Sequence, residues 1–384
     1  MIKKICVVTP GFPSNEKPYA YTFVDQLVCA LGDKGVEIVV ITPYDIIKNK
    51  AISTRIWERK TPQGNIIKVY SPGELTLTTR KIGPFNLCRI SEVLFRRGVY
   101  RILDKYDIHP DILYAHFLFP AGTCIASVGK KLGIPAVCAF GESSLWSIRE
   151  IGLEVARKKL SKLDGIIAVS TNNKNVLINN RLIDKEKIVV IPNAVNKQTF
   201  APGNRSDARK RLGLPQDQVI GIYNGSFTYE KGSLRVNEAC KDIKGLSMIY
   251  LGGGKQEPDG PNVLFKGRVA HNEVSTWLKA ADFFVLPTLE EGCCNAVIEA
   301  MSTGLPVITS DKPFNYDILD HDSALLVNPL EIKDIHDAME KLTESNELRI
   351  VYGNAALIKS QKLDINTRAE YVLDFLNGIR QRKD

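Results

Sequence analysis

Residues 282–310 read DFFVLPTLEEGCCNAVIEAMSTGLPVITS and form the most informative run in the chain. Its apolar start, 282–287, predicts a buried strand, and NAVIEAMS (295–302) predicts a helix that ends at Gly304 and Pro306. LPVITS then predicts a second buried strand. A strand, a loop, a helix and a parallel strand form a crossover unit, and such units bind ligands beyond the carboxyl end of the first strand.

Two glutamates flank the start of the predicted helix. Glu291 lies in the loop and Glu299 lies inside the helix. A helix N-terminus offers free N–H groups and partial positive charge to a phosphate, and a carboxylate further along the helix can accept hydrogen bonds from a ribose diol. Glu291 and the loop amides of 292–294 would then face whatever is attached beyond the phosphate. This arrangement suits a nucleotide-sugar, but a solvated loop glutamate and a helix-surface glutamate at this spacing are also common.

The composition bounds the protein class. A chain of 384 residues is long enough for two domains with separate cores. No uninterrupted apolar run is long enough for a transmembrane helix, and the opening MIKKICVVTP is too short and too β-branched for a signal-peptide core. We therefore expect a cytoplasmic protein.

Eight cysteines are present, and none forms a C-x-x-C pair. Most lie within apolar runs, so we expect reduced thiols that fill the core. The adjacent pair Cys293 and Cys294 suits neither a disulfide nor a zinc site. The sequence predicts no metal site.

The net charge of +8 is unevenly distributed, because residues 1–200 carry +12 and the remainder carries −4. Many basic residues gather between 80 and 105, where they alternate with apolar ones. They are Arg80, Lys81, Arg89, Arg96, Arg97, Arg101 and Lys105. Such a segment is typical of a basic amphipathic helix on an anionic membrane, and equally of an ordinary solvated helix face. No nucleic-acid-binding motif is present.

The remaining pattern alternates strands with helices. Strands are predicted at 4–9, 36–42, 111–115, 135–140, 163–170, 219–224, 248–254 and 262–268, and helices at 23–31, 121–132 and 330–345, with two more in 346–384. Between 51 and 90 only IIKVY predicts a strand, and an exposed loop is expected after it.

The stretch EGCCNAVIEAMSTGLPVI resembles the E-x7-E signature of retaining glycosyltransferases of family 4, in its EG, N, EAM and G-x-PVI pieces. The resemblance implies the GT-B fold, which has two Rossmann-like domains facing each other across a cleft. It also implies a last helix that crosses back to the first domain. We accordingly expect an acceptor-side domain at 1–195 with about 365–384, and a nucleotide-sugar-binding domain at 196–364.

The resemblance assigns the donor site to the second domain. Lys231 would bind the diphosphate, Glu299 the ribose hydroxyls and Glu291 the sugar, while Ser226 stands where the family usually has an arginine. The full set of donor-binding candidates is Ser226, Lys231, Arg268, Glu291, Gly292, Cys293, Cys294, Asn295, Ala296 and Glu299.

On the acceptor side the family pattern is less well preserved. Tyr21 stands where a subgroup of the family has glycine, and Phe140 replaces the histidine that points at the reacting sugar. The acceptor-side candidates are Gly11, His116, Gly141, Glu142 and Ser143. His116 joins Glu291 and Lys231 as a catalytic candidate.

The function implied is retaining transfer of a sugar, most commonly from a UDP-sugar, to a glycan or lipid-linked acceptor in bacterial surface-polysaccharide assembly. Neither a cofactor nor a metal is expected, because Lys231 and the helix N-terminus can offset the charge on the leaving diphosphate. A GT-B sugar-nucleotide epimerase and a non-catalytic nucleotide-sugar-binding protein remain as alternatives. A Rossmann dehydrogenase is disfavoured, because no G-x-G-x-x-G follows the first strand.

Overall fold

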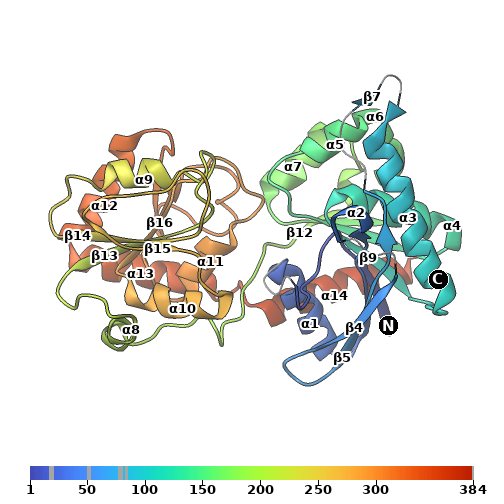
Figure 1. Ribbon diagram of the computed structural model, residues 1–384, viewed down its shortest axis with the longest axis horizontal. Helices are drawn as coiled ribbons and strands as arrows, with labels where there is room; N and C mark the ends of the chain where they lie inside the picture. Colours follow the sequence, from blue (N-terminus) through green and yellow to red (C-terminus); the bar gives the residue numbers. More distant parts are fainter. Residues whose placement is uncertain (17–20, 50–52, 77–80, 83–84, 383–384) are drawn as a thin grey trace. The chain divides into compact units, whose positions relative to one another are not determined.

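The chain divides into two compact units, each with its own sheet (Figure 1). Unit 1 comprises Met1–Ile191 and Asn366–Asp384, and unit 2 comprises Pro192–Ile365. The computed structural model describes residues 1–16, 21–49, 53–76, 81–82 and 85–382. Within these residues no helix is both long and apolar enough to cross a membrane.

Unit 1 is built on a sheet with the strand order β12-β11-β10-β9-β1-β2-β5-β4. Neighbouring strands are parallel, except that β4 is antiparallel to β5. The strands are β1 (Lys4–Val8), β2 (Glu37–Ile41), β4 (Arg55–Lys60), β5 (Ile66–Ser71), β9 (Ile112–His116), β10 (Ala136–Phe140), β11 (Gly165–Ala168) and β12 (Ile188–Val190). The central strands β9, β10 and β11 are buried along their whole length, because helices cover both faces of a parallel sheet.

The helices of unit 1 follow its strands in sequence. They are α1 (Thr22–Asp33), α2 (Ile46–Asn49), α3 (Leu87–Lys105), α4 (Thr123–Leu132), α5 (Trp146–Ile151), α6 (Leu153–Leu160), α7 (Thr171–Asn179) and α14 (Ile365–Gln381). Shorter elements are the strand pairs β3 (Tyr44–Asp45) with β6 (Gly73–Glu74) and β7 (Lys81–Ile82) with β8 (Phe85–Asn86), a π turn at Leu118–Gly122 and a 3-10 turn at Lys185–Lys187.

The segment between 51 and 90 contains more structure than its pattern predicts. The predicted strand is present as β5, but β4 precedes it and was not predicted. Most of the side chains of β4 are exposed, since it is an edge strand paired only with β5, so it lacks an apolar alternation. An exposed loop was expected after β5, but the short strand β6 forms there and its Glu74 is buried, so the expectation is only partly right. Residues 77–80 lie outside the described part of the chain.

Helix α14 belongs to unit 1, as the resemblance implied for the last helix. Phe375 packs so closely on β11 that a Cβ atom added to Gly165 would lie 2.7 Å from the ring atom Cζ. The backbone N–H of Ile2 donates to Oδ1 of Asn377 at 2.8 Å. The end of the chain thus completes the unit that its beginning starts.

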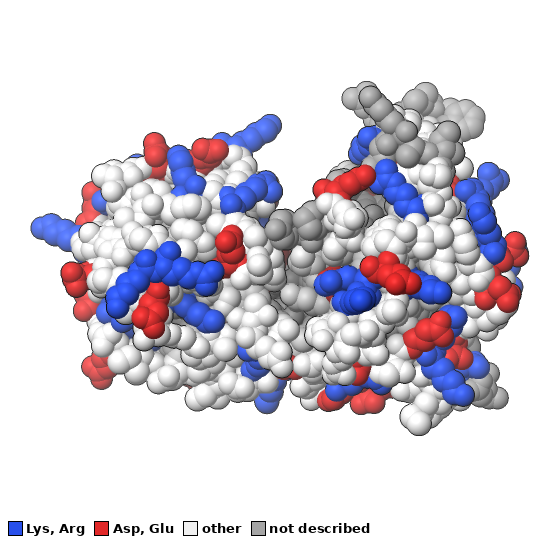
Figure 2. Space-filling model, turned by 60° about the horizontal axis from the view of Figure 1, so that its bottom comes forward, with Lys and Arg blue, Asp and Glu red and all other residues white. Residues whose placement is uncertain are grey.

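The basic helix α3 is amphipathic, with its apolar side turned into unit 1. Phe95, Val99 and Ile102 are buried in the core of the unit, whereas Arg97 and Arg101 are exposed. Arg80 lies outside the described residues, and only the backbone of Lys81 is described. On the face shown in Figure 2, basic and acidic side chains are interspersed over both units.

Unit 2 is built on a parallel sheet with the order β15-β14-β13-β16-β17-β18. Its strands are β13 (Val219–Asn224), β14 (Leu246–Leu251), β15 (Val263–Gly267), β16 (Phe283–Leu286), β17 (Val307–Ser310) and β18 (Leu325–Val327). Its helices are α8 (Arg205–Leu212), α9 (Ser233–Ala239), α10 (His271–Ala280), α11 (Asn295–Ser302), α12 (Ile332–Glu344) and α13 (Asn346–Ser360). In Figure 1, α9 and α12 lie on one side of this sheet, and α8, α10 and α13 lie on the other.

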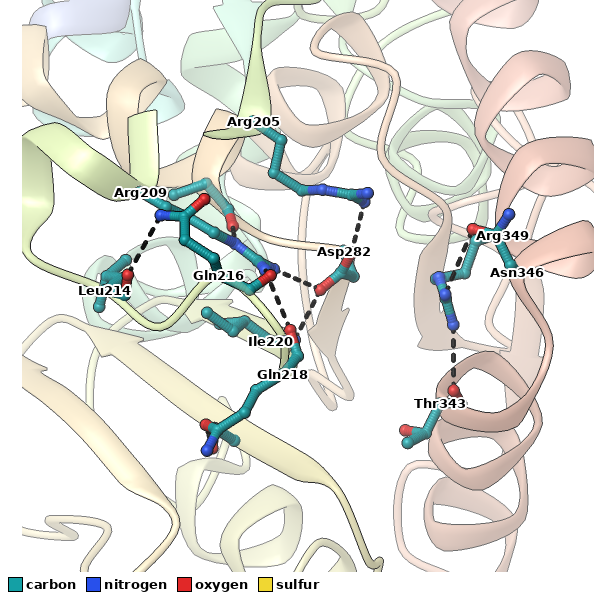
Figure 3. Close-up of polar contacts among 12 residues, drawn as sticks. Arg205, Arg209, Leu214, Gln216, Gln218, Ile220, Asp282, Thr343, Asn346 and Arg349 are labelled. Carbon is teal, nitrogen blue, oxygen red and sulfur yellow. Dashed lines mark hydrogen bonds and ion pairs between the residues drawn. The ribbon is translucent and has the colours of Figure 1, made fainter. Parts of the chain in front are cut away.

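A buried carboxylate fixes the start of β16. Asp282 accepts from Nη2 of Arg209 at 2.6 Å and from the backbone N–H of Ile220 at 2.7 Å, and it also pairs with Arg205 (Figure 3). Arg209 donates its remaining N–H groups to backbone carbonyls, including that of Ala280. The buried charges of Asp282 and Arg209 are paired with each other. Because Asp282 also binds the backbone of β13, it holds the start of β16 beside that strand and so fixes where the loop after β16 begins.

The chain enters unit 2 near residue 192 and leaves it near residue 365, and these two segments pair with each other. Val195 and Asp364 form an isolated parallel bridge. The N–H of Val195 donates to the carbonyl of Leu363 at 3.1 Å, and that of Ile365 donates to the carbonyl of Val195 at 3.0 Å. Unit 2 therefore begins and ends at one place.

Candidate functional site

The strand order of unit 2 reverses between β13 and β16. From β13 the chain adds β14 and then β15 on one side, and from β16 it adds β17 and then β18 on the other. The loops that leave the carboxyl ends of β13 and β16, 225–232 and 287–294, therefore start next to each other. In open α/β sheets this is the position at which ligands bind.

Direct contacts hold these two loops together. The N–H of Leu289 donates to the carbonyl of Glu230 at 2.7 Å. Arg235, on α9, donates from Nη2 to the carbonyl of Pro287 at 2.9 Å. The predicted site residues of the two loops are thus kept in one place.

Lys231 and Glu291 form an ion pair between the two loops. Only 26% of the Lys231 side chain and 16% of the Glu291 side chain are exposed. Burial by itself would lower the pKa of Lys231, but the charge of Glu291 and its hydrogen bond outweigh this effect and raise the pKa. Lys231 is therefore a fixed cation at the carboxyl ends of β13 and β16, and its counter-ion is Glu291.

Helix α11 begins at Asn295 and ends at Ser302, as predicted from NAVIEAMS. Its N-cap residue is Cys294, and no side chain caps the first turn. The loop before it is held by Nδ2 of Asn193, which donates to the carbonyl of Cys293 at 3.2 Å. Among the described residues, Oδ1 of Asn295 is buried without a hydrogen-bond partner. The start of α11 therefore presents an uncapped first turn, the arrangement that binds anions.

Glu299 lies in the second turn of α11 and is almost fully buried, with 7% of the residue exposed. Its Oε2 accepts from Nδ2 of Asn224, at the end of β13, at 3.5 Å. Its Oε1 lies 3.2 Å from Nε2 of His271, the first residue of α10. The hydrogen bond to Glu299 raises the pKa of His271, although burial opposes this effect.

The sequence did not predict a role for His271. It lies 28 positions before Glu299 and in another helix, so no local spacing connects the two. It follows shortly after Arg268, one of the donor-binding candidates predicted from the sequence. That proximity is the only sequence signal that could have identified it.

Ser226 and Arg268 lie at the same end of the sheet, after β13 and β15. Both are exposed. The carbonyl of Ser226 accepts from the Tyr223 hydroxyl at 2.8 Å, and the Arg268 side chain passes so close to Gly253 that a Cβ atom there would lie 2.8 Å from Nε. The donor-side residues predicted from the sequence are thus gathered at one end of one sheet.

His116 ends β9 in unit 1 and is buried, with 4% of the residue exposed. The rings of Tyr114, Phe23 and Phe117 surround it edge-on, with centroids 5.2, 6.1 and 6.4 Å away. Burial, with the charge of Arg368 adding to it, lowers the pKa of His116 to about 3. The imidazole is therefore neutral, and among the described residues its Nε2 has no hydrogen-bond partner.

Glu142 is engaged by backbone groups. Its Oε1 accepts from the N–H of Leu118 at 2.6 Å and its Oε2 accepts from that of Gly141 at 3.2 Å. Burial raises the pKa of Glu142 to about 7, although these hydrogen bonds oppose the rise. Its carboxylate shapes the turn after β9, whereas the neighbouring Ser143 is exposed.

The two acceptor-side departures from the family pattern, Tyr21 and Phe140, both pack against other groups of unit 1. The Tyr21 ring covers Gly11, since a Cβ atom there would lie 2.1 Å from Cε2 of the tyrosine. Tyr21 itself adopts a left-handed conformation with φ of 55°. Phe140 is buried in the core of unit 1, so an apolar ring replaces a polar one inside the unit.

All eight cysteines are buried and none forms a disulfide, which fits their predicted role as core residues. In the described part of the chain, His, Cys, Asp and Glu side chains form no group of three that could hold a metal ion.

Two family descriptions match successive parts of the chain. "Glycosyltransferase Family 4" matches residues 20–199, and "Glycosyl transferases group 1" matches residues 219–345. The first match falls in unit 1 apart from its last residues, and the second lies in unit 2.

Individual proteins agree with this. The chain is 27% identical over 356 residues to TuaC of Bacillus subtilis (strain 168), named as a teichuronic acid biosynthesis glycosyltransferase, with 88% of both chains covered. It is 27% identical to the Escherichia coli UDP-Gal:alpha-D-GlcNAc-diphosphoundecaprenol alpha-1,3-galactosyltransferase, covering 70% of this chain and 75% of the relative. The structure of sucrose-phosphate synthase from Thermosynechococcus elongatus superimposes with a TM-score of 0.79 at 18% identity, covering 99% and 100% of the two chains. The likeness in structure confirms the predicted GT-B fold.

Proposed function

The chain belongs to the group 1 glycosyltransferases of family 4, and we propose that it transfers a sugar, with retention of configuration, from a UDP-sugar to a lipid-linked acceptor of surface-polysaccharide assembly. The observation that carries the proposal is the gathering of Lys231, Glu291 and Glu299 around the uncapped start of α11. The name of the galactosyltransferase relative contains both a UDP-sugar and a diphosphoundecaprenol-linked sugar, which supports these substrate classes.

In this proposal unit 2 holds the donor. The diphosphate binds at the N–H groups of Asn295 and Ala296 and at Lys231, because both provide positive charge. The ribose hydroxyls donate to Glu299. Glu291 and the 292–295 backbone receive the sugar hydroxyls, and Ser226 contributes one neutral hydrogen bond to the phosphates. Arg268 would contact the nucleotide base.

Transfer then follows front-face attack. The bond from the acceptor oxygen to the anomeric carbon forms on the face from which the diphosphate oxygen departs, and the acceptor's proton passes to that departing oxygen. Negative charge grows on the diphosphate as the bond breaks. Lys231 and the amides of α11 stabilise that charge without reorganising, because their positions are fixed before the reaction.

Unit 1 would hold the acceptor beyond the carboxyl ends of β1 and β9, where its own strand order reverses. The candidate residues there are Gly11, His116, Gly141, Glu142 and Ser143. His116 would act as a neutral hydrogen-bonding group, since it is not protonated near neutral pH.

Helix α3 would bring this unit to the inner face of an anionic membrane. Because its apolar side is buried in the core, the attraction would come from exposed charges such as Arg97, Arg101 and Lys105 and not from insertion. Sedimentation with phosphatidylglycerol vesicles should therefore succeed at low salt and fail at high salt.

The donor is tested by a thermal-shift screen of UDP-, GDP- and ADP-sugars, since binding to the native state raises the melting temperature. The donor that binds is then incubated with a diphosphoundecaprenol-linked sugar, and the linkage formed is determined by NMR. Transfer with retention supports the proposal. Epimerisation of the donor without acceptor, or binding with no turnover under any condition, would contradict it.

A further inference from the structure

The imidazole of His271 is part of the environment of Glu299. Its Nε2 lies 3.2 Å from Oε1 of Glu299, and 29% of the His271 side chain is exposed. The Phe200 ring packs edge-on against the imidazole with centroids 5.7 Å apart, and Phe200 itself is buried. The histidine is thus held in one orientation, with one nitrogen directed at the carboxylate.

The two oxygens of Glu299 have different partners. His271 approaches Oε1 from α10, and Asn224 donates to Oε2 from the end of β13. Each carboxylate oxygen can accept more than one hydrogen bond, so both keep capacity for the hydroxyls of a ribose. Because the partners come from different elements, they fix the plane of the carboxylate.

The two partners differ in charge. The amide of Asn224 is neutral at every pH, whereas His271 can carry a full positive charge. A charged imidazole makes the His271–Glu299 pair neutral overall, and a neutral imidazole leaves a buried anion. The nucleotide-sugar diphosphate is itself anionic, so the second state opposes its binding.

We propose that His271 is a positioning residue for the donor, which orients Glu299 toward the ribose and makes nucleotide-sugar affinity depend on its own protonation. This inference rests on the proposed function, because it takes Glu299 as the ribose-binding residue. It assigns to His271 a role that the family signature does not contain.

The direction of the pH dependence follows from the surrounding charges. Glu299 raises the pKa of His271, so the charged imidazole persists to a higher pH than in an isolated histidine. The neighbouring acid on α10, Glu273, accepts from the N–H of Ala270 at 3.3 Å, and the carboxylate that raises the pKa of His271 is Glu299. Donor affinity should therefore fall as the pH rises through the pKa of His271.

The test measures the dissociation constant of a nucleotide-sugar by calorimetry between about pH 6 and about pH 8.5. The probe is whichever of UDP-glucose, GDP-mannose and ADP-glucose binds the native chain, since their diphosphate diesters do not titrate in this range. His271→Gln retains a hydrogen-bond donor without the charge, and His271→Ala removes both. His109→Gln, at an exposed histidine of unit 1, is the matched control.

We expect the affinity of the native chain and of the His109→Gln control to fall severalfold with pH, and that of His271→Gln to be flat. His271→Ala should bind about tenfold more weakly at low pH, the loss typical of a hydrogen bond to a charged group. In a Glu299→Gln background, removal of His271 should have little further effect, because the histidine acts through that carboxylate.

Two results would overturn the inference. One is a native pH profile in His271→Gln, and the other is an unchanged effect of His271→Ala in the Glu299→Gln background. Failure of the native chain to bind any of the three probes would instead overturn the donor site, and this inference with it. Melting temperatures of all variants identify any that fail to fold.

Discussion

Lys231 and Glu291 come from two different loops and neutralise each other at the carboxyl ends of β13 and β16. In the family signature one is assigned to the diphosphate and the other to the sugar. In the proposed complex the donor meets charges already oriented by each other, and its phosphates share Lys231 with Glu291. Removal of either partner should therefore affect the reaction more than the fold.

Lys231→Ala and Glu291→Ala should each lower the rate of sugar transfer by a factor of about 10²–10³, the loss typical of a preorganised electrostatic group. Initial rates with the identified donor measure this. Lys266→Ala should retain the native rate, because the side chain of this exposed lysine contacts only Pro258, Glu257 and Asp259 among the described polar contacts and none of these is a donor-site candidate. Normal turnover in both variants with every active donor would show that the site is wrongly assigned.

Asp282→Asn should destabilise unit 2 strongly, because it leaves Arg209 buried and charged without its carboxylate. Breaking a buried pair in this way costs about 3–5 kcal/mol. Urea denaturation followed by circular dichroism measures the change. The exposed helix pair of Lys333 and Asp337 provides the control, and Asp337→Asn should change the free energy of unfolding by less than about 1 kcal/mol.

Gly165→Ala should weaken the packing of α14 on β11, since the new methyl group would meet the Phe375 ring at 2.7 Å. Overpacking of this kind costs about 1–3 kcal/mol. Gly378→Ala is the matched control, because that glycine lies in α14 with open space beside it and alanine favours helix. It should leave the melting temperature unchanged or raise it. A Gly165→Ala protein as stable as the native one would contradict the packing described for α14.

Gly11→Ala should destabilise unit 1, because its Cβ atom would lie 2.1 Å from Cε2 of the Tyr21 ring, far inside van der Waals contact. Tyr21→Gly should be tolerated, since glycine adopts the left-handed conformation of residue 21 without strain. In the double variant the effect of Gly11→Ala should largely disappear. Melting temperatures of the four proteins form a double-mutant cycle, and additive effects would exclude the contact.

His116→Phe should reduce the sensitivity of the protein to acid. The pKa of His116 is about 3 in the folded protein and close to its ordinary value of about 6.5 in the unfolded chain. The unfolded chain therefore binds more protons between these values, and the native protein loses stability as the pH falls from about 6.5 toward about 3. Melting temperatures between about pH 4 and about pH 7 should fall less steeply in the variant. Equal slopes would contradict a neutral, buried His116.

The sequence predicted best where burial dictates the pattern. The helix over 295–302 has the predicted bounds, because an apolar strand, a glycine and a proline enclose it. Strand β4 was missed because an exposed edge strand is held by backbone hydrogen bonds to its neighbour and needs no apolar side-chain pattern. The tail was predicted as two helices, and these are α13 and α14.

The grouping of the candidate site residues was predictable to the extent that they are local in sequence. Glu291, Glu299 and the start of α11 share one stretch, and Lys231 follows a strand end of its own. His271 was not predictable, since its meeting with Glu299 depends on how α10 and α11 pack on one sheet. The role of Glu142 in holding the turn after β9 was also hidden, because its partners are backbone groups.

The bridge between Val195 and Asp364 joins the two ends of unit 2, which is inserted between the two parts of unit 1. This order of segments has a consequence for synthesis of the protein on the ribosome. Unit 2 is an uninterrupted segment, whereas unit 1 needs both the first and the last part of the chain. Although residues 1–191 are synthesised before unit 2, the surface of β11 that α14 covers stays open until residues 366–384 have also been made. Unit 2 can therefore finish folding while unit 1 still exposes apolar surface, which is when chaperones would be needed most.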